Sequence, residues 1–336
     1  MIRILVVLLT LFITSTSQKT ENDCSTTFNV VLTTIPPRFG SVSSTIRSLM
    51  EQEIRPAYIF IFIPLKYARF SRLKRTVKEM SSNSEIESEN FRELLIAKLS
   101  QETAISALIS LEVLQIITIE KDWGPVTKFA GILFYYYQIK KEAIQLRHPL
   151  PDYWVVCDDD VHYRSIMLSK YHFALSTMLL EGVGPIDGLT HFSEDYRIAF
   201  LLDNESQHRT PIHVQGVDTF MISNRVFESQ HDSSGPLSFE TFRTIVQYFH
   251  QNCPSTFYQD DYIISFLLNM ANITLTSIWN NDNMAEHIEG VSKSNFQMHM
   301  HQNVFVREHA TKKCIVDHAQ TIYFLVESKS SDCKSA

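Results

Sequence analysis

The chain alternates between short apolar runs and longer stretches whose apolar residues recur at helical spacing. Runs rich in β-branched and aromatic residues predict strands, and they lie at 28–34, 57–63, 113–119, 154–157, 185–191, 212–222, 273–279 and 323–326. Helical spacing predicts helices over 41–52, 66–111 (with a polar break at 81–90), 128–147, 166–180, 239–251 and 262–270. Strands alternating with helices are typical of βαβ units. We therefore expect an α/β fold with a mostly parallel central sheet flanked by helices.

The pattern is not interrupted by an internal repeat or a low-complexity linker, so we expect a single domain over about residues 25–330. Residues 280–310 are polar and are expected to form loops.

The run at 154–157 ends in three adjacent carboxylates, Asp158, Asp159 and Asp160. Burying unpaired carboxylates is costly, so they are best placed at the exposed carboxyl end of a strand, where open α/β sheets bind ligands. On an extended backbone Asp158 and Asp160 would point to the same side, and a hard divalent cation could take an oxygen from each. The alternative is an Asp-rich turn with solvated side chains.

The composition of the chain restricts the classes of ligand that it is expected to bind. The formal net charge is −7 over 336 residues, which argues against a nucleic-acid binder, because such proteins normally carry a basic face. Only 9 residues are glycine, and neither G-x-G-x-x-G nor a P-loop is present. An anionic ligand would therefore need a metal or a few well-placed cations.

The N-terminus resembles a secretory signal peptide. Arg3 precedes an apolar run over 4–13 and then small polar residues, which predicts a signal peptide over about 1–17, with a short uncleaved signal anchor as the alternative. We therefore expect the secretory pathway, either the lumen of the endoplasmic reticulum or Golgi or the exterior. Asn204 and Asn272 open glycosylation sequons that such a location would make usable.

The cysteine count is odd, so at least one thiol is unpaired if the others pair within the chain. The five cysteines are Cys24, Cys157, Cys253, Cys314 and Cys333. Cys157 lies in the apolar strand and is our choice for a buried free thiol. A disulfide of Cys314 with Cys333, or of Cys253 with either, is compatible with the sequence.

Several ordered motifs together resemble the GT-A class of nucleotide-sugar glycosyltransferases, whose sheet is Rossmann-like. The resemblance covers most of residues 28–310. It comprises T-T-I-P-P-R after the first strand, D-W-G-P-V-T-K before a helix, D-D-D after W-V-V-C, Q-G-V-D followed by F-M-I-S, and C-P-S-T-F-Y-Q-D-D-Y-I-I-S. Asp218 stands where a smaller residue is expected, and 66–111 does not align with the class.

The resemblance implies a metal site at the acidic triplet, which is similar to the D-x-D motif of this class. Asp158 and Asp160 would be ligands, and Asp159 would reach the ribose or a sugar hydroxyl. A late histidine, His301 or His299, would be a third ligand, although both could instead be surface histidines in a polar tail. All-oxygen ligation suits Mn²⁺ or Mg²⁺, and a histidine ligand favours Mn²⁺.

The resemblance also implies a site for a nucleotide-sugar donor, linked to UDP or GDP. Lys128 follows a Gly-Pro turn at the start of a predicted helix, where anions are favoured, and would contact the nucleotide or diphosphate. Arg38 would face the same crevice, and Gln215 and Gly216 would floor the sugar pocket. An exposed helical lysine is the alternative for Lys128.

The late acidic pair is aligned with the catalytic base of inverting members. Asp261 would accept a proton from the acceptor hydroxyl, and Asp260 would cap the helix or bind the acceptor, although the reverse assignment is open. Ordinary helix-capping charge is the alternative for both. The acceptor would be a hydroxyl of a glycan, protein or lipid, and the oligomeric state is not predicted.

Two other functional classes compete with a glycosyltransferase. One is a hydrolase, either a glycosidase with Asp160 and Asp261 flanking the bond or a two-metal phosphoesterase. The other is a lectin-like protein that binds sugar or nucleotide without turnover.

Overall fold

The structure is a computed structural model that describes residues 26–67, 91–142, 150–181, 186–191, 219–229, 235, 237–253, 256, 260–273, 275–278, 285–287, 313–315 and 317–322. The predicted signal peptide at 1–17 and the predicted strand at 323–326 lie outside these ranges. Within them, no helix has both the length and the apolar character that crossing a membrane requires.

The fold is built on a seven-stranded sheet with the order β3-β2-β1-β4-β7-β6-β8. Its strands are β1 (Phe28–Thr33), β2 (Tyr58–Pro64), β3 (Leu114–Ile119), β4 (Tyr153–Val156), β6 (Gly188–His191), β7 (Phe220–Ser223) and β8 (Leu275–Ile278). β1 pairs in parallel with β2 and β4, β2 with β3, and β6 with β8, whereas β7 is antiparallel to both of its neighbours. The predicted mostly parallel sheet is confirmed.

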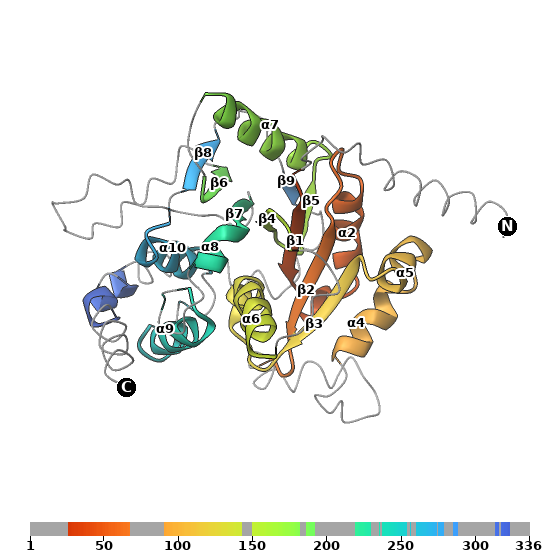
Figure 1. Ribbon diagram of the computed structural model, residues 1–336. Coiled ribbons are helices and arrows are strands. Elements are labelled where there is room, and N and C mark those ends of the chain that lie inside the picture. Colours follow the sequence, from red (N-terminus) through yellow and green to blue (C-terminus); the bar gives the residue numbers. More distant parts are fainter. Residues whose placement is uncertain are drawn as a thin grey trace, which may run out of the picture.

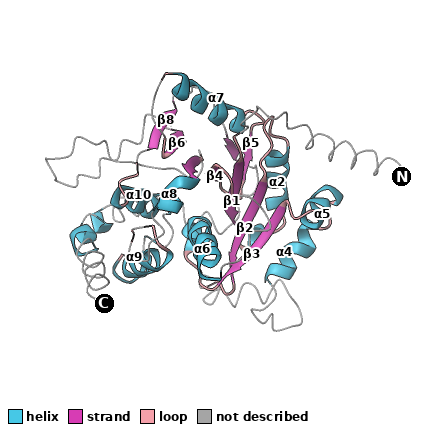
Figure 2. Ribbon diagram, viewed as in Figure 1, coloured by secondary structure: helices cyan, strands magenta, loops and turns pink. Residues whose placement is uncertain are grey.

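Helices cover both faces of the sheet. Successive residues of a strand point to opposite sides, and since apolar strand residues point to both sides, both faces are buried. Trp154 packs into one core and Val155 into the other. The Val155 face is covered by α2 (Val42–Met50), α4 (Phe91–Leu99), α5 (Thr103–Ser110) and α7 (Met167–Leu180). The Trp154 face is covered by η4 (Gly124–Val126), α6 (Thr127–Glu142), α8 (Asn224–Ser229), α9 (Phe239–Asn252) and α10 (Asp260–Met270). Figures 1 and 2 show α6 and α2 on opposite sides of β1 and β2.

The order of the strands creates a switch point between β1 and β4. The chain runs from β1 outward to β2 and β3, and α6 then returns it to β4 on the other side of β1. Because β1 and β4 are parallel, their carboxyl ends lie at the same edge of the sheet. In open α/β sheets a ligand crevice forms where the strand order reverses in this way.

Some short elements differ from the sequence-based expectation. Residues 91–111 form two helices, α4 and α5, separated at 100–102, and Lys66 and Tyr67 are not helical. The expected loop over 280–310 contains a strand, β9 (Ala285–His287), which pairs antiparallel with β5 (Val161–Tyr163). Strands of three residues are too short to produce a periodic pattern, so only their partner defines them.

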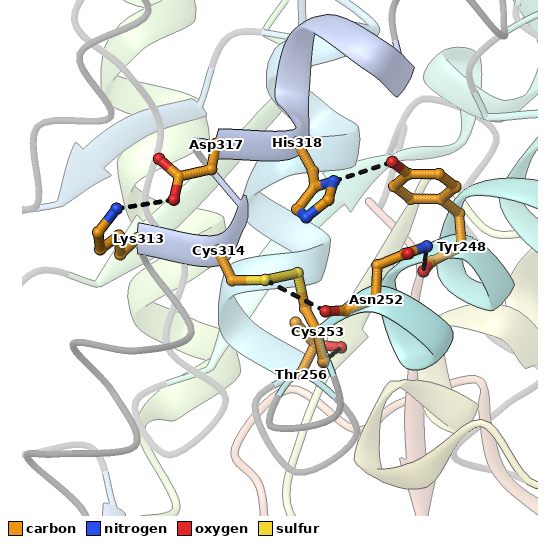
Figure 3. Close-up of a disulfide and its surroundings, with 8 residues drawn as sticks. All are labelled: Tyr248, Asn252, Cys253, Thr256, Lys313, Cys314, Asp317 and His318. Carbon is orange, nitrogen blue, oxygen red and sulfur yellow. Dashed lines mark hydrogen bonds and ion pairs between the residues drawn. A yellow bond between two sulfur atoms is a disulfide. The ribbon is translucent and has the colours of Figure 1, made fainter.

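A second element that the sequence did not predict is a short helical stretch near the C-terminus, which a disulfide connects to α9. Residues 313–315 and 317–322 are helical, and Cys314 is bonded to Cys253 at the end of α9, with 5.9 Å between the Cα atoms (Figure 3). Beside it, Tyr248 Oη lies 2.8 Å from His318 Nδ1. This pairing is one of those left open by the sequence. Three apolar residues of these helical stretches are buried in the core that surrounds α10: Ile315, Ala319 and Ile322.

We predict that Gly131→Ala destabilises the protein by about 1–3 kcal/mol, the usual cost of overpacking a core. Gly131 lies on α6, where an added Cβ would come within 2.0 Å of Cγ of the buried Phe62 ring on β2. Urea unfolding of Gly131→Ala and wild type measures the difference. Gly40→Ala is the matched control, because its Cβ would meet nothing within 4 Å. Equal stability of Gly131→Ala and wild type would show that α6 does not pack tightly on β2.

Candidate functional site

Arg38 is carried to the carboxyl edge of the sheet by the turn that follows β1. Pro36 and Pro37 begin a 3-10 turn, η1 (Pro36–Arg38), because proline lacks the N–H that strand pairing requires. The Arg38 guanidinium then bridges two carboxylates, with Nη1 2.7 Å from Asp159 Oδ1 and Nη2 3.1 Å from Asp160 Oδ2. A planar guanidinium suits such a bridge, because its N–H groups diverge in a fixed fork.

The environment of Arg38 keeps it charged. Its side chain is 23% exposed, and burial by itself would lower its pKa. The carboxylates of Asp159 and Asp160 outweigh burial and raise the pKa of Arg38 above its ordinary value. The cation is therefore permanent at any pH at which the protein folds.

Lys128 is positioned by the residues of the D-W-G-P-V-T-K motif. Gly124 adopts a φ of 70°, a left-handed conformation that glycine accepts without strain, and its N–H donates to Asp122 Oδ1 at 2.9 Å. The Trp123 N–H donates to Thr127 Oγ1 at 3.2 Å. These two bonds close the turn and start α6, so that Lys128 lies in its first helical turn.

The ammonium group of Lys128 is buried and forms an ion pair with Asp158 Oδ1. Its side chain is only 2% exposed, whereas that of Asp158 is 25% exposed. Lys128 is therefore not the exposed helical lysine considered as the alternative. A buried ammonium group requires a partner, because desolvation of an unpaired charge costs several kcal/mol.

The backbone of the acidic cluster, by which we mean Asp158, Asp159 and Asp160, and of the residues after it is held by side chains on α2 and just beyond its end. Thr45 Oγ1 donates to the Asp159 carbonyl at 2.9 Å. The Tyr163 N–H donates to Ser48 Oγ at 3.0 Å, and Gln52 Nε2 donates to the carbonyl that follows Tyr163 at 2.8 Å. Sequence reasoning missed these three side chains, of which Thr45 and Ser48 lie on α2 and Gln52 lies two residues beyond its end. The available signal was three uncharged polar residues spaced by three and four, a spacing that places residues on one face of the helix predicted over 41–52.

Tyr163 fixes the cluster from its other side. Its hydroxyl oxygen accepts the Asp158 N–H at 2.8 Å, and burial raises the pKa of Tyr163 well above its ordinary value, so the phenol remains protonated. Burial likewise raises the pKa of Cys157, which precedes the cluster. Cys157 is free and fully buried, as expected from its place in the strand.

The charges of the cluster are not fully balanced by its two cations. Counted over the ion pairs of the described residues, three carboxylates against Arg38 and Lys128 leave one net negative charge. In addition, Asp159 Oδ2 is buried without a hydrogen-bond partner among the described residues. Carboxylate oxygens with residual negative charge and a free buried acceptor match the donor preference of a hard divalent cation.

The cluster does not form a converged set of metal ligands. Asp159 and Asp160 lie in a turn, not in an extended segment, so they share Arg38 while Asp158 faces Lys128. Within the described ranges, three potential ligand atoms come within 4.8 Å of one another only at Cys253, Cys314 and His318, where both sulfurs belong to the disulfide. The assignment of Asp158 and Asp160 as metal ligands stays a prediction.

The helix that carries Asp260 and Asp261 packs against the turn that precedes Lys128. α10 begins at Asp260 and contacts η4. Asp261 is partly exposed, and its backbone carbonyl accepts a hydrogen bond from Ser265 Oγ at 2.5 Å. Two acidic motifs that are about a hundred residues apart in sequence are therefore both linked to the D-W-G-P-V-T-K turn, one through Lys128 and one through α10.

The remaining predicted site residues, Gln215, Gly216, His299 and His301, lie outside the described residues, and their roles stay predictions. A different histidine, His287, is placed next to the acidic cluster by strand pairing. In the β5–β9 pair, His287 is opposite Val161, the residue that follows Asp160. The sequence showed His287 only as one of several histidines in a polar stretch, because the pairing of β9 depends on tertiary structure.

The solved structures that are similar to this chain include two glycosyltransferases. No protein-family model and no curated protein matches the chain. Glucosyl-3-phosphoglycerate synthase of Mycobacterium tuberculosis, solved with Mn²⁺, UDP-glucose and phosphoglyceric acid, is 11% identical, with 79% of this chain and 87% of that chain covered and a TM-score of 0.35. Mouse xyloside xylosyltransferase 1, in its apo form, is 10% identical, with 75% and 84% covered and a TM-score of 0.33. Similarity at this level gives no ground for transferring an activity.

The D-W-G-P-V-T-K turn is also packed against α9. The ring of Trp123 contacts Phe242 and His250, with ring centroids 5.5 Å and 6.4 Å apart, and Lys121 Nζ lies 4.2 Å from the centroid of the Trp123 ring. Burial, with a smaller contribution from the Lys121 charge, lowers the pKa of His250 to about 4. The imidazole is therefore neutral in the folded protein near neutral pH.

We predict that Tyr163→Phe destabilises the protein by roughly 1–3 kcal/mol, because the Asp158 N–H would be left without its acceptor. Chemical denaturation of the purified variant measures the loss. Tyr153→Phe, at the start of β4, is the matched control, since the Tyr153 hydroxyl has no hydrogen-bond partner among the described residues. A variant as stable as wild type would mean that the phenol does not hold the cluster.

We predict that His250 makes the protein less stable as the pH falls from about 6.5 to about 4. An unfolded histidine has a pKa near 6.5, whereas that of folded His250 is about 4, so the unfolded chain gains the proton first and is favoured in this window. Melting temperatures of wild type and His250→Phe between pH 7.5 and 4 give the test. The wild type should lose more stability than the variant over this range, and parallel curves would contradict a buried neutral imidazole.

Proposed function

We propose that the chain is a metal-dependent glycosyltransferase that moves a sugar from a nucleoside-diphosphate sugar to a hydroxyl acceptor with inversion of configuration. The observation that carries the proposal is the meeting of the acidic cluster with Arg38 and buried Lys128 at the carboxyl ends of β1 and β4. Carboxylates that could bind a metal ion lie at the same edge of the sheet as two cationic side chains that could bind an anion. This combination suits a metal–diphosphate complex, whose two parts have opposite charge.

The donor side of the site follows from these charges. In our proposal Asp158 and Asp160 hold the metal, Mn²⁺ in preference to Mg²⁺, with His301 or His299 as a further ligand. The metal, when bound, acts as a Lewis acid on the diphosphate leaving group. Asp159 accepts a hydrogen bond from a ribose or sugar hydroxyl.

In the same proposal, two cationic side chains of the protein neutralise the phosphate groups of the donor. Arg38 and Lys128 bind phosphate oxygens, because guanidinium and ammonium groups form strong charge-assisted hydrogen bonds with them. Gln215 and Gly216 floor the sugar pocket. The donor is linked to UDP or GDP, and nucleic acid is not a partner.

The acceptor side uses the acidic pair at the start of α10. Asp261 takes the proton of the acceptor hydroxyl as its oxygen forms a bond to the anomeric carbon. The bond from that carbon to the diphosphate oxygen breaks, and its electron pair leaves with the diphosphate. Attack opposite the leaving group inverts the anomeric centre. Asp260 caps the helix or binds the acceptor, which is a hydroxyl of a glycan, protein or lipid.

The two competing classes account for fewer of these features. A glycosidase requires two carboxylates flanking its bond, but it does not require a guanidinium and a buried ammonium group beside them. A lectin-like protein could use the same donor site, so it differs from a transferase only in turnover.

We also propose a place in the secretory pathway, with residues 1–17 as a signal peptide or a short signal anchor. The Cys253–Cys314 disulfide supports this location, because structural disulfides persist in oxidising compartments.

We predict that UDP or GDP binds only in the presence of Mn²⁺, and that Asp160→Ala abolishes this binding by removing a metal ligand and the residual negative charge. Isothermal titration calorimetry with and without Mn²⁺ measures both effects. Asp317→Ala is the control, because Asp317 is exposed and paired with Lys313, so its binding should equal that of wild type. Absence of nucleotide binding by the wild type under all conditions would overturn the proposal.

Catalysis is tested separately with Asp261→Asn, which keeps the shape of the side chain but removes its basicity. Product formation from a nucleotide sugar and an acceptor should fall by about 10²-fold or more, in line with the usual contribution of a general base, with nucleotide affinity retained. Full turnover by this variant would exclude Asp261 as the base, and nucleotide binding by the wild type without turnover of any sugar would favour the lectin-like class.

A further inference from the structure

The carboxylates of the acidic cluster are already occupied by cations of the chain itself. Asp158 is paired with Lys128, and Asp159 and Asp160 are paired with Arg38. A divalent cation that uses these oxygens therefore competes with an ammonium and a guanidinium group. One oxygen of the cluster, Asp159 Oδ2, is buried and without a hydrogen-bond partner within the described part of the chain. At this atom an incoming cation meets no competing hydrogen-bond donor among the described residues.

Divalent metal binding would reverse the sign of the local charge. Among the described residues the cluster with Arg38 and Lys128 has one net negative charge, which repels a diphosphate. Adding a divalent ion changes this value to one net positive charge, which attracts it. The attraction is strong at this site, because charges that are partly buried are screened much less than charges in water.

We propose that Arg38 and Lys128 are exchangeable counterions: they hold the acidic cluster until a divalent cation takes its carboxylates, and they then bind the diphosphate. This inference rests on the proposed function and adds a coupling mechanism to it. Since coupling between two ligands is reciprocal, the factor by which metal strengthens nucleotide binding equals the factor by which nucleotide strengthens metal binding.

The surroundings of the cluster allow side chains to exchange while the backbone stays in place. The carbonyl of Asp159 is bonded to Thr45, and the N–H of Asp158 to the Tyr163 hydroxyl. Arg38 lies in a surface turn with its side chain 23% exposed, and the buried ammonium group of Lys128 pairs with Asp158, whose side chain is 25% exposed. Each ion pair therefore has one partly exposed member, and in our proposal exchange proceeds at the side chains while these backbone hydrogen bonds stay in place.

The decisive test is Mn²⁺ binding measured without nucleotide. In Lys128→Met and Arg38→Gln the competing cation is gone, so the affinity for Mn²⁺ alone should rise about tenfold or more over wild type, which corresponds to about 1.4 kcal/mol. In the same variants UDP or GDP should bind more weakly when Mn²⁺ is saturating. Calorimetry measures both affinities. The opposite signs of the two changes distinguish exchange from a plain phosphate contact, which would leave the affinity for Mn²⁺ alone unchanged.

Matched controls and a second readout keep the test independent of folding defects. Lys98→Met and Arg47→Gln remove the same side chains at exposed positions on α4 and α2, and should bind Mn²⁺ like wild type. The rise in melting temperature on adding Mn²⁺ should be larger in Lys128→Met and Arg38→Gln than in wild type, because the metal replaces the missing counterion. If Lys128→Met does not fold, Arg38→Gln carries the test, since Arg38 is partly exposed.

The outcomes separate this inference from the proposed function. If wild type binds nucleotide in a metal-dependent way but neither variant binds Mn²⁺ more tightly, the counterion exchange is overturned and the glycosyltransferase proposal stands. If both variants bind Mn²⁺ more tightly but bind nucleotide like wild type, the transfer of the cations to the diphosphate is overturned. If wild type binds no nucleotide, the proposed function fails, and this inference fails with it.

Discussion

Three adjacent carboxylates at the end of β4 impose the main constraint on this structure. They can stay close together only if positive charge lies beside them, and two elements distant in sequence provide it. Arg38 arrives from the turn after β1 and Lys128 from the first turn of α6. The strand order makes this possible, because β1 and β4 are parallel neighbours and α6 connects β3 to β4 across the sheet.

A second requirement is that the cluster be held without using its side chains. Thr45 and Ser48 on α2, and Tyr163 on β5, bind backbone groups in and just after the cluster, so the carboxylate oxygens remain available for cations. The polar face of α2 is therefore buried by the acidic turn, while its apolar face packs on the sheet. A mutation in α2 that is remote from any charge would still displace the cluster.

Much of the fold could be predicted from the sequence, because strands such as β1 and β2 are continuous apolar runs and helices such as α9 have a regular apolar face. The acidic cluster, Arg38 and Lys128 were also identified, since charged residues directly after predicted strands or at a predicted helix start indicate one sheet edge. What could not be predicted depended on tertiary contacts. The turn at Asp159 replaced the expected extended backbone because Thr45 and Arg38 hold it there. The β5–β9 pair joins residues more than a hundred positions apart, with no local signal in either strand.

The helical residues at 313–315 and 317–322 have a consequence for how the chain folds. Ile315, Ala319 and Ile322 are buried in the same core as Tyr262, Ile263 and Phe266 of α10. During synthesis the sheet strands β1 to β4 emerge first and can pair, whereas the core around α10 remains open until residue 322 has left the ribosome. The half of the molecule that carries Asp261 is therefore the last to be completed, and the nascent chain exposes its apolar surface for longest.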